Sequence, residues 1–392
     1  MEKFDFIPYG RQDITEEDIN EVIKVLRSNF LTQGSVVPAF EQKLCNYIGV
    51  KYSVVVNSCT SALHIACLAL DLGPGDILWT SPITFVASAN CALYCGATVD
   101  FVDIDIDTAL MSVEKLKRKL EWAEKEGKLP KIVIPVHFAG QSCDMREIHA
   151  LSQRYDFKII EDAAHAIGAE YQNDLVGGCQ YSDITVFSFH PVKIITTGEG
   201  GAAMTNSLLY AEKMKLLRSH GIIRDKSKMT GNPDGPWYYE QIDLGFNYRM
   251  TDIQAALGNS QLNRLDWYVS RRKEFSEWYD EKFHNTGITP LTQKKDRKSA
   301  HHLYVLKVID SNQDNKKLYN YLYQKGIGVN LHYIPIYKQP FFQKKMVNLN
   351  IKELSTENAD KYYSQALTLP LHPRMTLEML EYIVNKIYIF FD

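Results

Sequence analysis

The chain has no long apolar run and no block of basic residues, and each absence excludes a class of protein. No stretch reaches the roughly 20 apolar residues that a membrane helix needs, and the first residues, MEKFDFIPYGRQDITEED, contain no apolar signal core. The 44 basic and 47 acidic side chains are mixed along the sequence and leave a net charge of −3, so no surface is expected to follow a nucleic-acid backbone. These absences predict a cytoplasmic protein that binds neither membranes nor nucleic acids.

Cysteine pairs with metal-binding spacing are also missing. The seven cysteines are odd in number, and none forms a C-x-x-C pair. We therefore expect reduced thiols and no metal site. Cys91 and Cys95 lie four residues apart in an expected helix, where two small buried apolar groups are the favoured interpretation.

Length and hydrophobic patterning indicate a two-domain α/β protein. The 392 residues are 45% hydrophobic, enough for two buried cores. Between residues 52 and 205, the β-branched runs YSVVV, ILWT, VDFVD, KIVIPV, FKIIE and DITVFSF alternate with helical segments such as TFVASANCALY and MREIHALSQRY. This alternation predicts a mostly parallel sheet covered by helices on both faces, with ligands at the carboxyl ends of its strands.

The pattern changes after Arg249. Thr251 and Gln254 have the spacing of a capping box and open a helical pattern that we expect to form one long helix over residues 251–283. The strand-like HHLYVLKVI, a helix, the loop IGVNLHYIPIYKQPFF and a last helix follow. We therefore expect a large domain with an N-terminal arm over residues 1–250, and a linking helix with a small α+β domain over residues 251–392.

The first candidate binding feature follows the strand YSVVV. Asn57, Ser58, Cys59, Thr60 and Ser61 precede the apolar helix ALHIACLAL, so hydroxyls and free backbone N–H groups gather at a helix N-terminus. Such a terminus can hold a phosphate. Helix capping without a ligand explains the same residues equally well.

A second candidate is the pair Glu161 and Asp162 at the end of the strand FKII. A carboxylate there can point into the crevice where α/β sheets bind ligands. The alternative is an N-cap for a helix formed by DAAHAIG, which is the better explanation if nothing else supports a site. His165 could face the same crevice or pack in the core.

A third candidate is Lys193 in FSFHPVKIITTGEGGAAMTN, between a strand and a glycine-rich turn. Most loop lysines are simply exposed. A partly desolvated lysine, however, has a lowered pKa and can form an imine with a carbonyl group. Together, the helix N-terminus, the carboxylate and the lysine match the phosphate, the pyridine nitrogen and the aldehyde of pyridoxal 5′-phosphate.

With these residues in view, the sequence resembles the DegT/DnrJ/EryC1/StrS sugar aminotransferases over nearly the whole chain. The resemblance is carried by IPYGRQDITEEDI, LRSNFLTQG, NSCTSALHIACLAL, SPITFVASANCALYCGATVDFVDID, IIEDAAHAIGA, FSFHPVKIITTGEGG, LRSHGI, GFNYRMTDIQAALG, VNLHYIPIY and LTLPLHP. It implies the pyridoxal-phosphate-dependent, aspartate aminotransferase-like fold (fold type I).

The same resemblance implies roles for individual residues. Lys193 matches the Schiff-base lysine, Asp162 the partner of the pyridine nitrogen, and Phe85 the aromatic residue that stacks on the ring. The remaining cofactor contacts would come from Cys59, Thr60 and Ser188 at the phosphate, from His165 beside the ring, and from Asn247 at the phosphate of a neighbouring subunit. The family pattern thus implies a homodimer with shared active sites. Cys59 departs from the usual Gly or Ala at its position.

Among subfamilies, the chain is most similar to the aminotransferases of pseudaminic acid biosynthesis, on the segments WTSPITFVASANC, GQSCDM and DGPWYYEQIDLGFNYRMTDIQAALG. This implies that L-glutamate gives its amino group and leaves as 2-oxoglutarate, and that the 4-keto group of a UDP-linked 4-keto-6-deoxy-N-acetylhexosamine receives it. The residues implied to bind the nucleotide sugar are Tyr9, Asn29, Phe30, Leu31, Thr32, His332, Tyr333, Ile334 and Pro335.

Other functions stay open from the sequence. The chain could act on a different nucleotide-linked keto sugar, or it could be a cofactor-binding regulator without turnover. A pyridoxal-phosphate sugar dehydratase is less favoured, because some relatives of that type replace the lysine with histidine and Lys193 is present here. A nucleotide-binding protein without covalent chemistry is disfavoured because G-x-G-x-x-G is missing after the first strand, and so is G-x-x-x-x-G-K-[ST].

Overall fold

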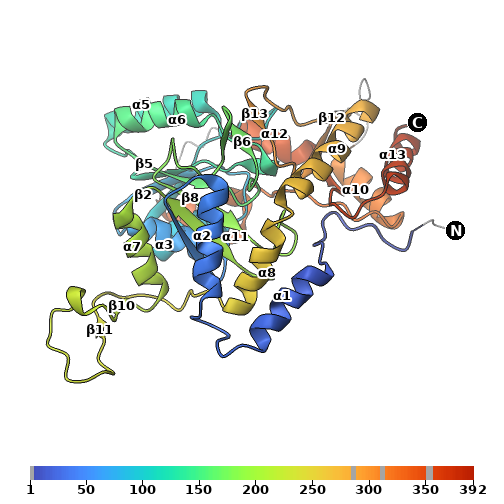
Figure 1. The fold of residues 1–392 in the computed structure, drawn as a ribbon. Coiled ribbons are helices and arrows are strands. Elements are labelled where there is room, and N and C mark those ends of the chain that lie inside the picture. The colour runs from blue at the N-terminus through green and yellow to red at the C-terminus, as the bar shows by residue number, and fades with distance from the viewer. Residues whose placement is uncertain (1–3, 284–287, 310–313, 350–355) are drawn as a thin grey trace.

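A computed structural model describes residues 4–283, 288–309, 314–349 and 356–392, and its largest element is a seven-stranded sheet (Figure 1). The strand order is β1-β9-β8-β5-β4-β2-β3. The strands are β1 (Tyr52–Val56), β2 (Ile77–Thr80), β3 (Thr98–Phe101), β4 (Ile132–Ile134), β5 (Lys158–Asp162), β8 (Ile184–Ser188) and β9 (Gly201–Thr205). β9 is antiparallel to both neighbours, and the other strands run in one direction. The six predicted strands and the mostly parallel sheet are confirmed.

Helices cover both faces of this sheet because alternate residues of a strand point to opposite sides. In β4, Ile132 and Ile134 belong to the apolar cluster with α3, α4 and α7, whereas Val133 belongs to the cluster with α5 and α6. α2 and α8 complete the second face over β1, β8 and β9. These helices are α2 (Val36–Ile48), α3 (Cys59–Ala69), α4 (Ala87–Tyr94), α5 (Val113–Glu126), α6 (Met145–Tyr155), α7 (Leu208–Arg218) and α8 (Asp252–Leu262).

The capping box at Thr251 is present, but the single long helix that we expected is wrong. α8 ends at Leu262, and α9 (Leu265–Phe283) begins after a short turn. Lys43 of α2 donates to the carbonyl oxygen of Asn259 at 2.6 Å and to the side chain of Asn263 at 2.5 Å. The carbonyl oxygen of Asn259, in the last turn of α8, therefore has a partner outside the helix, which favours the end of the helix there.

The chain after α9 forms a smaller α+β part. Its antiparallel sheet has the order β12-β14-β15, with β12 (Ile288–Pro290), β14 (Tyr304–Val308) and β15 (Ala366–Leu369). The helices of this part are α10 (Asn315–Gln324), α11 (Pro340–Leu349), α12 (Glu357–Gln365) and α13 (Leu377–Phe391). Ile7 of the N-terminal segment pairs with Ile327 of this part, ahead of α1 (Glu16–Leu26). A domain boundary between residues 250 and 251 stays a prediction.

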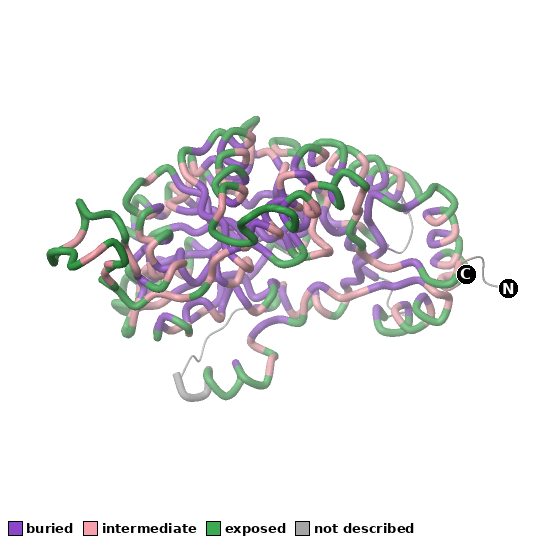
Figure 2. Tube along the Cα trace, turned by 60° about the horizontal axis from the view of Figure 1, so that its bottom comes forward, coloured by how far each residue is buried: buried purple, intermediate pink, exposed green. Residues whose placement is uncertain are grey.

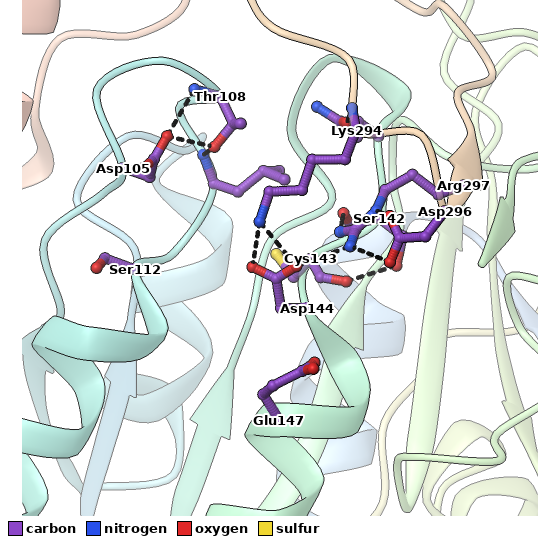
Figure 3. A network of polar contacts seen from close by, with 12 residues as sticks. Asp105, Thr108, Ser112, Ser142, Cys143, Asp144, Glu147, Lys294, Asp296 and Arg297 are labelled. Carbon is purple, nitrogen blue, oxygen red and sulfur yellow. Dashed lines mark hydrogen bonds and ion pairs between the residues drawn. The ribbon is translucent and has the colours of Figure 1, made fainter. Parts of the chain in front are cut away.

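A network of ion pairs holds the segment before β14 against the start of α6 (Figure 3). Lys294 Nζ and Arg297 Nη2 each lie 2.7 Å from the carboxylate of Asp144. Arg297 is almost fully buried and also donates to the carbonyl oxygen of Ser142. Arg297 begins the short strand β13 (Arg297–Lys298), which pairs with β6 (Glu170–Tyr171) and through it with β7 (Asp174–Leu175). The contacts tie the C-terminal part to the start of α6 and to β6, which follow the central strands β4 and β5 in the chain.

A hairpin formed by β10 (Ile222–Ile223) and β11 (Glu240–Gln241) projects from the body of the molecule (Figure 1). Most of its residues are exposed (Figure 2), including Trp237 at 71% of its surface, and Leu244, which follows the hairpin, is 75% exposed. Exposed apolar groups of this size are typical of surfaces that contact another protein.

The cysteines and the helices can be compared with the expected reduced thiols and the expected lack of a membrane helix. All seven cysteines are free thiols, and Cys67 and Cys91 are fully buried between α3 and α4. Within the described part of the chain, no helix combines the length and the apolar character needed to cross a bilayer.

Candidate active site

A pocket of about 920 Å³ opens at the carboxyl ends of β1, β2, β5 and β8, where an α/β sheet is expected to bind ligands. The segments after these strands form one side of the pocket, and residues from the C-terminal part form the other. Eleven of the predicted site residues line it: Tyr9, Cys59, Thr60, Phe85, Asp162, His165, Ser188, Lys193, His332, Tyr333 and Ile334.

The N-terminus of α3 enters the pocket directly from β1. Ser58 caps the helix and accepts a hydrogen bond from the N–H of Ser61 at 3.1 Å. Cys59 and Thr60 occupy the first turn, where N–H groups have no partner inside the helix. A Cβ atom at Gly201 would lie 2.6 Å from the nitrogen of Cys59, so this glycine allows β9 to pass close beneath the turn. Both functions that the sequence left open, cap and anion cup, are compatible with this geometry.

β5 sends its last two carboxylates to opposite faces of the sheet. Asp162 lines the pocket, where its Oδ1 accepts the N–H of Ala164 at 3.1 Å. Glu161 is buried on the other side, 2.7 Å from the imidazole of His137. Burial raises the pKa of Glu161, but the hydrogen bonds from His137, Ser182 and Thr185 outweigh it, so that the pKa is lowered. Only Asp162 is therefore placed to meet a ligand.

The helix that we considered over DAAHAIG is absent, so the N-cap interpretation of Asp162 is wrong. The segment forms two successive tight turns, in which Ala166 donates to the carbonyl oxygen of Ala163 and Ala169 donates to that of Ala166. Gly168 has a φ of +82°, a conformation that ends helical geometry. The carboxylate thus shapes a turn beside the pocket.

Lys193 lies at the end of a turn in which its N–H donates to the carbonyl oxygen of His190 at 2.9 Å. Burial lowers the pKa of Lys193 to about 8, although the carboxylate of Asp162 acts in the opposite direction. An amine with this pKa is partly neutral near physiological pH and can act as a nucleophile or a base.

His165 is a buried, neutral imidazole at the wall of the pocket. Burial, followed by the charge of Lys193, holds the pKa of His165 well below its usual range. Its Nδ1 accepts the N–H of Ala139 at 3.3 Å, so the ring proton is on Nε2, which lies 3.2 Å from the hydroxyl of Tyr333. Tyr333 accepts that bond and keeps its own proton to donate into the pocket.

The thiol of Cys59 does not add a charge to the site. Burial, together with the neighbouring carboxylate of Asp162, raises the pKa of Cys59 well above that of a free cysteine. The thiol therefore stays protonated, and the departure from the family pattern leaves the charge at this position unchanged.

Six predicted residues lie outside the pocket. Residues 29–32 form an exposed loop after α1, and Pro335 follows the lining residue Ile334. Asn247 is exposed beside the end of β1, where its carbonyl oxygen lies 3.5 Å from the amide of Asn57. The roles of all six stay predictions.

Sequence reasoning missed several polar residues of the pocket. Thr84 lies between β2 and α4, and Ser88 lies in the first turn of α4. Asn330 and Gln339 flank the predicted HYIP stretch. The signal for Thr84 and Ser88 was two hydroxyl residues four apart in the otherwise apolar TFVASANCALY, which suggests one buried polar face.

Comparison with known proteins finds close relatives along almost the whole chain. The sequence pattern of the DegT/DnrJ/EryC1/StrS aminotransferase family matches residues 12–388. The UDP-4-amino-4,6-dideoxy-N-acetyl-beta-L-altrosamine transaminase of Campylobacter jejuni serotype O:23/36 is 38% identical over 384 residues, which cover 97% of this chain and 96% of that protein.

Solved structures agree with this likeness. PseC of Helicobacter pylori, an aminotransferase involved in the biosynthesis of pseudoaminic acid, superimposes with a TM-score of 0.89 at 33% identity and covers 98% of this chain and 99% of its own. A sugar aminotransferase of Streptococcus pneumoniae, Spr1654, in its PLP form has a TM-score of 0.85 at 30% identity, with 97% of both chains covered.

Proposed function

The chain belongs to the DegT/DnrJ/EryC1/StrS aminotransferase family, and we propose that it transfers the amino group of L-glutamate to the 4-keto group of a UDP-linked 4-keto-6-deoxy-N-acetylhexosamine in pseudaminic acid biosynthesis. Its membership makes it a sugar aminotransferase. The observation that carries the proposal is a lysine of lowered pKa, Lys193, in one pocket with Asp162 and the N-terminus of α3.

Pyridoxal 5′-phosphate fits the residues of this pocket. The first turn of α3, with Cys59 and Thr60, offers unpartnered N–H groups to a phosphate, and Ser188 adds a hydroxyl. Asp162 can accept a hydrogen bond from a ring nitrogen. Phe85 lines the pocket with 59% of its surface exposed, which leaves a free aromatic face for a ring.

When bound, the cofactor supplies an aldehyde that takes up the amino group and a ring that withdraws electrons from the reacting carbon. Lys193 removes and returns the proton at that carbon, and its pKa of about 8 lets it do both near neutral pH. His165 stays neutral and leaves the positive charge to Lys193, while Tyr333 offers a proton for a hydrogen bond to a bound oxygen.

A substrate panel tests the proposed function. The purified protein, loaded with pyridoxal 5′-phosphate, is incubated with L-glutamate and UDP- or dTDP-linked 4-keto and 3-keto sugars, and 2-oxoglutarate and the amino sugar are measured, the latter by NMR. We expect one 2-oxoglutarate per 4-amino sugar formed from the UDP-linked 4-keto-6-deoxy-N-acetylhexosamine.

Each other outcome has a distinct meaning. Preference for another keto sugar assigns a different nucleotide-sugar aminotransferase. Loss of a sugar hydroxyl without 2-oxoglutarate indicates a dehydratase. Cofactor binding without turnover on any sugar indicates a regulator, and each of these results overturns the proposed reaction.

We also propose that the active enzyme is a homodimer in which Asn247 reaches the phosphate site of the partner subunit. The exposed apolar side chains of Trp237, on the projecting hairpin, and Leu244, just after it, support a protein partner for this surface. Asn247 follows and is also exposed. A cytoplasmic location is in line with seven unpaired thiols, because reducing compartments keep cysteines free.

Subunit complementation tests this arrangement. Asn247→Ala is expected to lower activity about tenfold, since one hydrogen bond to a charged group is lost. Two differently tagged chains, one with Lys193→Ala and the other with Asn247→Ala, are co-expressed and the hybrid dimer is isolated. If the two residues serve one site from different chains, one of the two active sites of the hybrid contains neither substitution. The hybrid then has about half of the wild-type activity.

The hybrid of Lys193→Ala with Asp162→Ala is the control, since both proposed residues belong to the same chain's pocket and neither site is intact. A hybrid of Lys193→Ala with Asn247→Ala that is no more active than an Asn247→Ala site alone would place Asn247 outside the partner's site.

A further inference from the structure

Two buried hydroxyl groups approach the carboxylate of Asp162 from the segment that consists of the loop after β2 and the first turn of α4. Ser88 Oγ lies 2.6 Å from Asp162 Oδ2, and Thr84 Oγ1 lies 2.8 Å from Ser88 Oγ. Both side chains are almost completely buried, Ser88 at 1% and Thr84 at 3% exposure. Neither residue has a role in the function proposed above.

The two hydrogen bonds that link Thr84, Ser88 and Asp162 are both donated toward the carboxylate. An ionised carboxylate can only accept, so Ser88 donates its single hydroxyl proton to Asp162. The carbonyl oxygen of Phe85 is also near Ser88 Oγ, but at 3.3 Å it is a weaker acceptor than the carboxylate. Ser88 Oγ is then free to accept, and Thr84 donates to it.

The second oxygen of the carboxylate is fixed from the other side. Asp162 Oδ1 accepts the backbone N–H of Ala164. With one donor on each oxygen, rotation about the last bond of the side chain breaks at least one hydrogen bond, and the carboxylate keeps one orientation at the wall of the pocket.

We propose that Ser88 and Thr84 are positioning residues of the transamination site, which set the plane of the Asp162 carboxylate toward the ring nitrogen of the cofactor. The inference rests on the proposed function, because it needs the cofactor ring above Asp162. Phe85 lies in the same segment, so one stretch of chain both orients the carboxylate and presents the aromatic face.

A merely structural role of these hydroxyls must be distinguished from positioning. Ser88 lies in the first turn of α4, and its N–H donates to the carbonyl oxygen of Phe85, so its replacement could affect folding alone. A structural role changes stability only. Positioning also changes the affinity for the cofactor, and it changes kcat more than the KM for glutamate.

The test begins with Ser88→Ala. We expect kcat to fall about tenfold and the Kd of pyridoxal 5′-phosphate for the apoprotein to rise about tenfold, because one charge-assisted hydrogen bond is lost. The KM for glutamate should change less than about threefold, since Ser88 affects the reaction rather than uniform substrate binding.

Thr84→Val supplies a second variant of nearly equal volume, which keeps the test open if Ser88→Ala does not fold. Alone it should raise the Kd of the cofactor by about threefold, through the weakened donor Ser88. In the Ser88→Ala background it should add nothing, because Thr84 acts through Ser88. Ser88→Thr, which keeps a hydroxyl, should recover most of the cofactor affinity.

Ser81→Ala is the matched control. Ser81 is also a buried serine of this segment, at 1% exposure, but its hydroxyl faces the carbonyl oxygen of Ile83. It should leave the cofactor Kd and kcat unchanged.

The inference is overturned if the wild type binds the cofactor on Lys193 while Ser88→Ala keeps the same Kd and kcat. Additive effects of Ser88→Ala and Thr84→Val would contradict the inference that Thr84 acts through Ser88. If the wild type yields no borohydride-fixed cofactor on Lys193, the proposed function itself fails, which is a separate result.

Discussion

Lys193→Ala should lower kcat by about 10⁴-fold or more, because the variant loses both the proton-transferring amine and the covalent anchor of the cofactor. The amine is placed for both roles, since burial lowers its pKa to about 8 in the same pocket as Asp162. Turnover is measured as 2-oxoglutarate formation, and attachment by borohydride reduction followed by peptide mass spectrometry.

Two further lysine variants make this result specific. Lys193→Arg keeps a positive charge but cannot give up its proton, so it should be as inactive as the alanine variant. Lys298→Ala removes a lysine whose side chain is 70% exposed and should retain wild-type activity. A thermal midpoint equal to that of the wild type excludes unfolding, and an active Lys193→Ala enzyme with its cofactor attached would refute the assignment.

The folded protein should lose stability steeply below pH 6.5, because it buries neutral histidines. Burial, with the charges of Arg272, Arg11 and Arg374, lowers the pKa of His372 to about 4, and burial with Lys193 lowers that of His332 to about 3. Between pH 6.5 and these values, the unfolded chain binds protons that the folded chain does not. Their contribution is therefore complete above pH 6.5 and falls as the pH is lowered, by about 2 kcal/mol for each histidine at pH 5.

His372→Phe isolates one of these contributions. The ring of His372 is 3% exposed and neither nitrogen has a hydrogen-bond partner, so phenylalanine replaces its packing without removing a bond. Between pH 8 and pH 5, the free energy of unfolding should fall by about 2 kcal/mol less in the variant than in the wild type. Urea unfolding at both pH values measures this difference, and the value at pH 8 corrects for altered packing. An equal fall in both proteins would show that His372 takes up its proton in the folded state.

Local sequence patterns predicted the strands of the large sheet correctly. The six β-branched runs became strands, because central strands of a parallel sheet are buried on both faces and need continuous apolar sequence. The capping box at Thr251 also appeared where its spacing predicted, since its hydrogen bonds lie within four residues. Prediction failed where a contact between distant segments decides the end of a helix. Lys43 of α2 caps the end of α8, and no pattern within residues 251–283 indicates that contact.

The candidate site was likewise predicted in part from local sequence and decided in part by contacts between distant segments. Lys193, Asp162 and the start of α3 could be named from the sequence, because each follows a strand whose carboxyl end faces the crevice of an α/β sheet. The sequence by itself determined these chemical groups and their order along the chain. Only the tertiary structure decided that Asp162 faces the pocket while Glu161 pairs with His137, and that Ser88, 74 residues away, donates to Asp162. The reason is physical: the pKa of Lys193, the tautomer of His165 and the orientation of Asp162 depend on burial and on partners that come together only when distant segments pack.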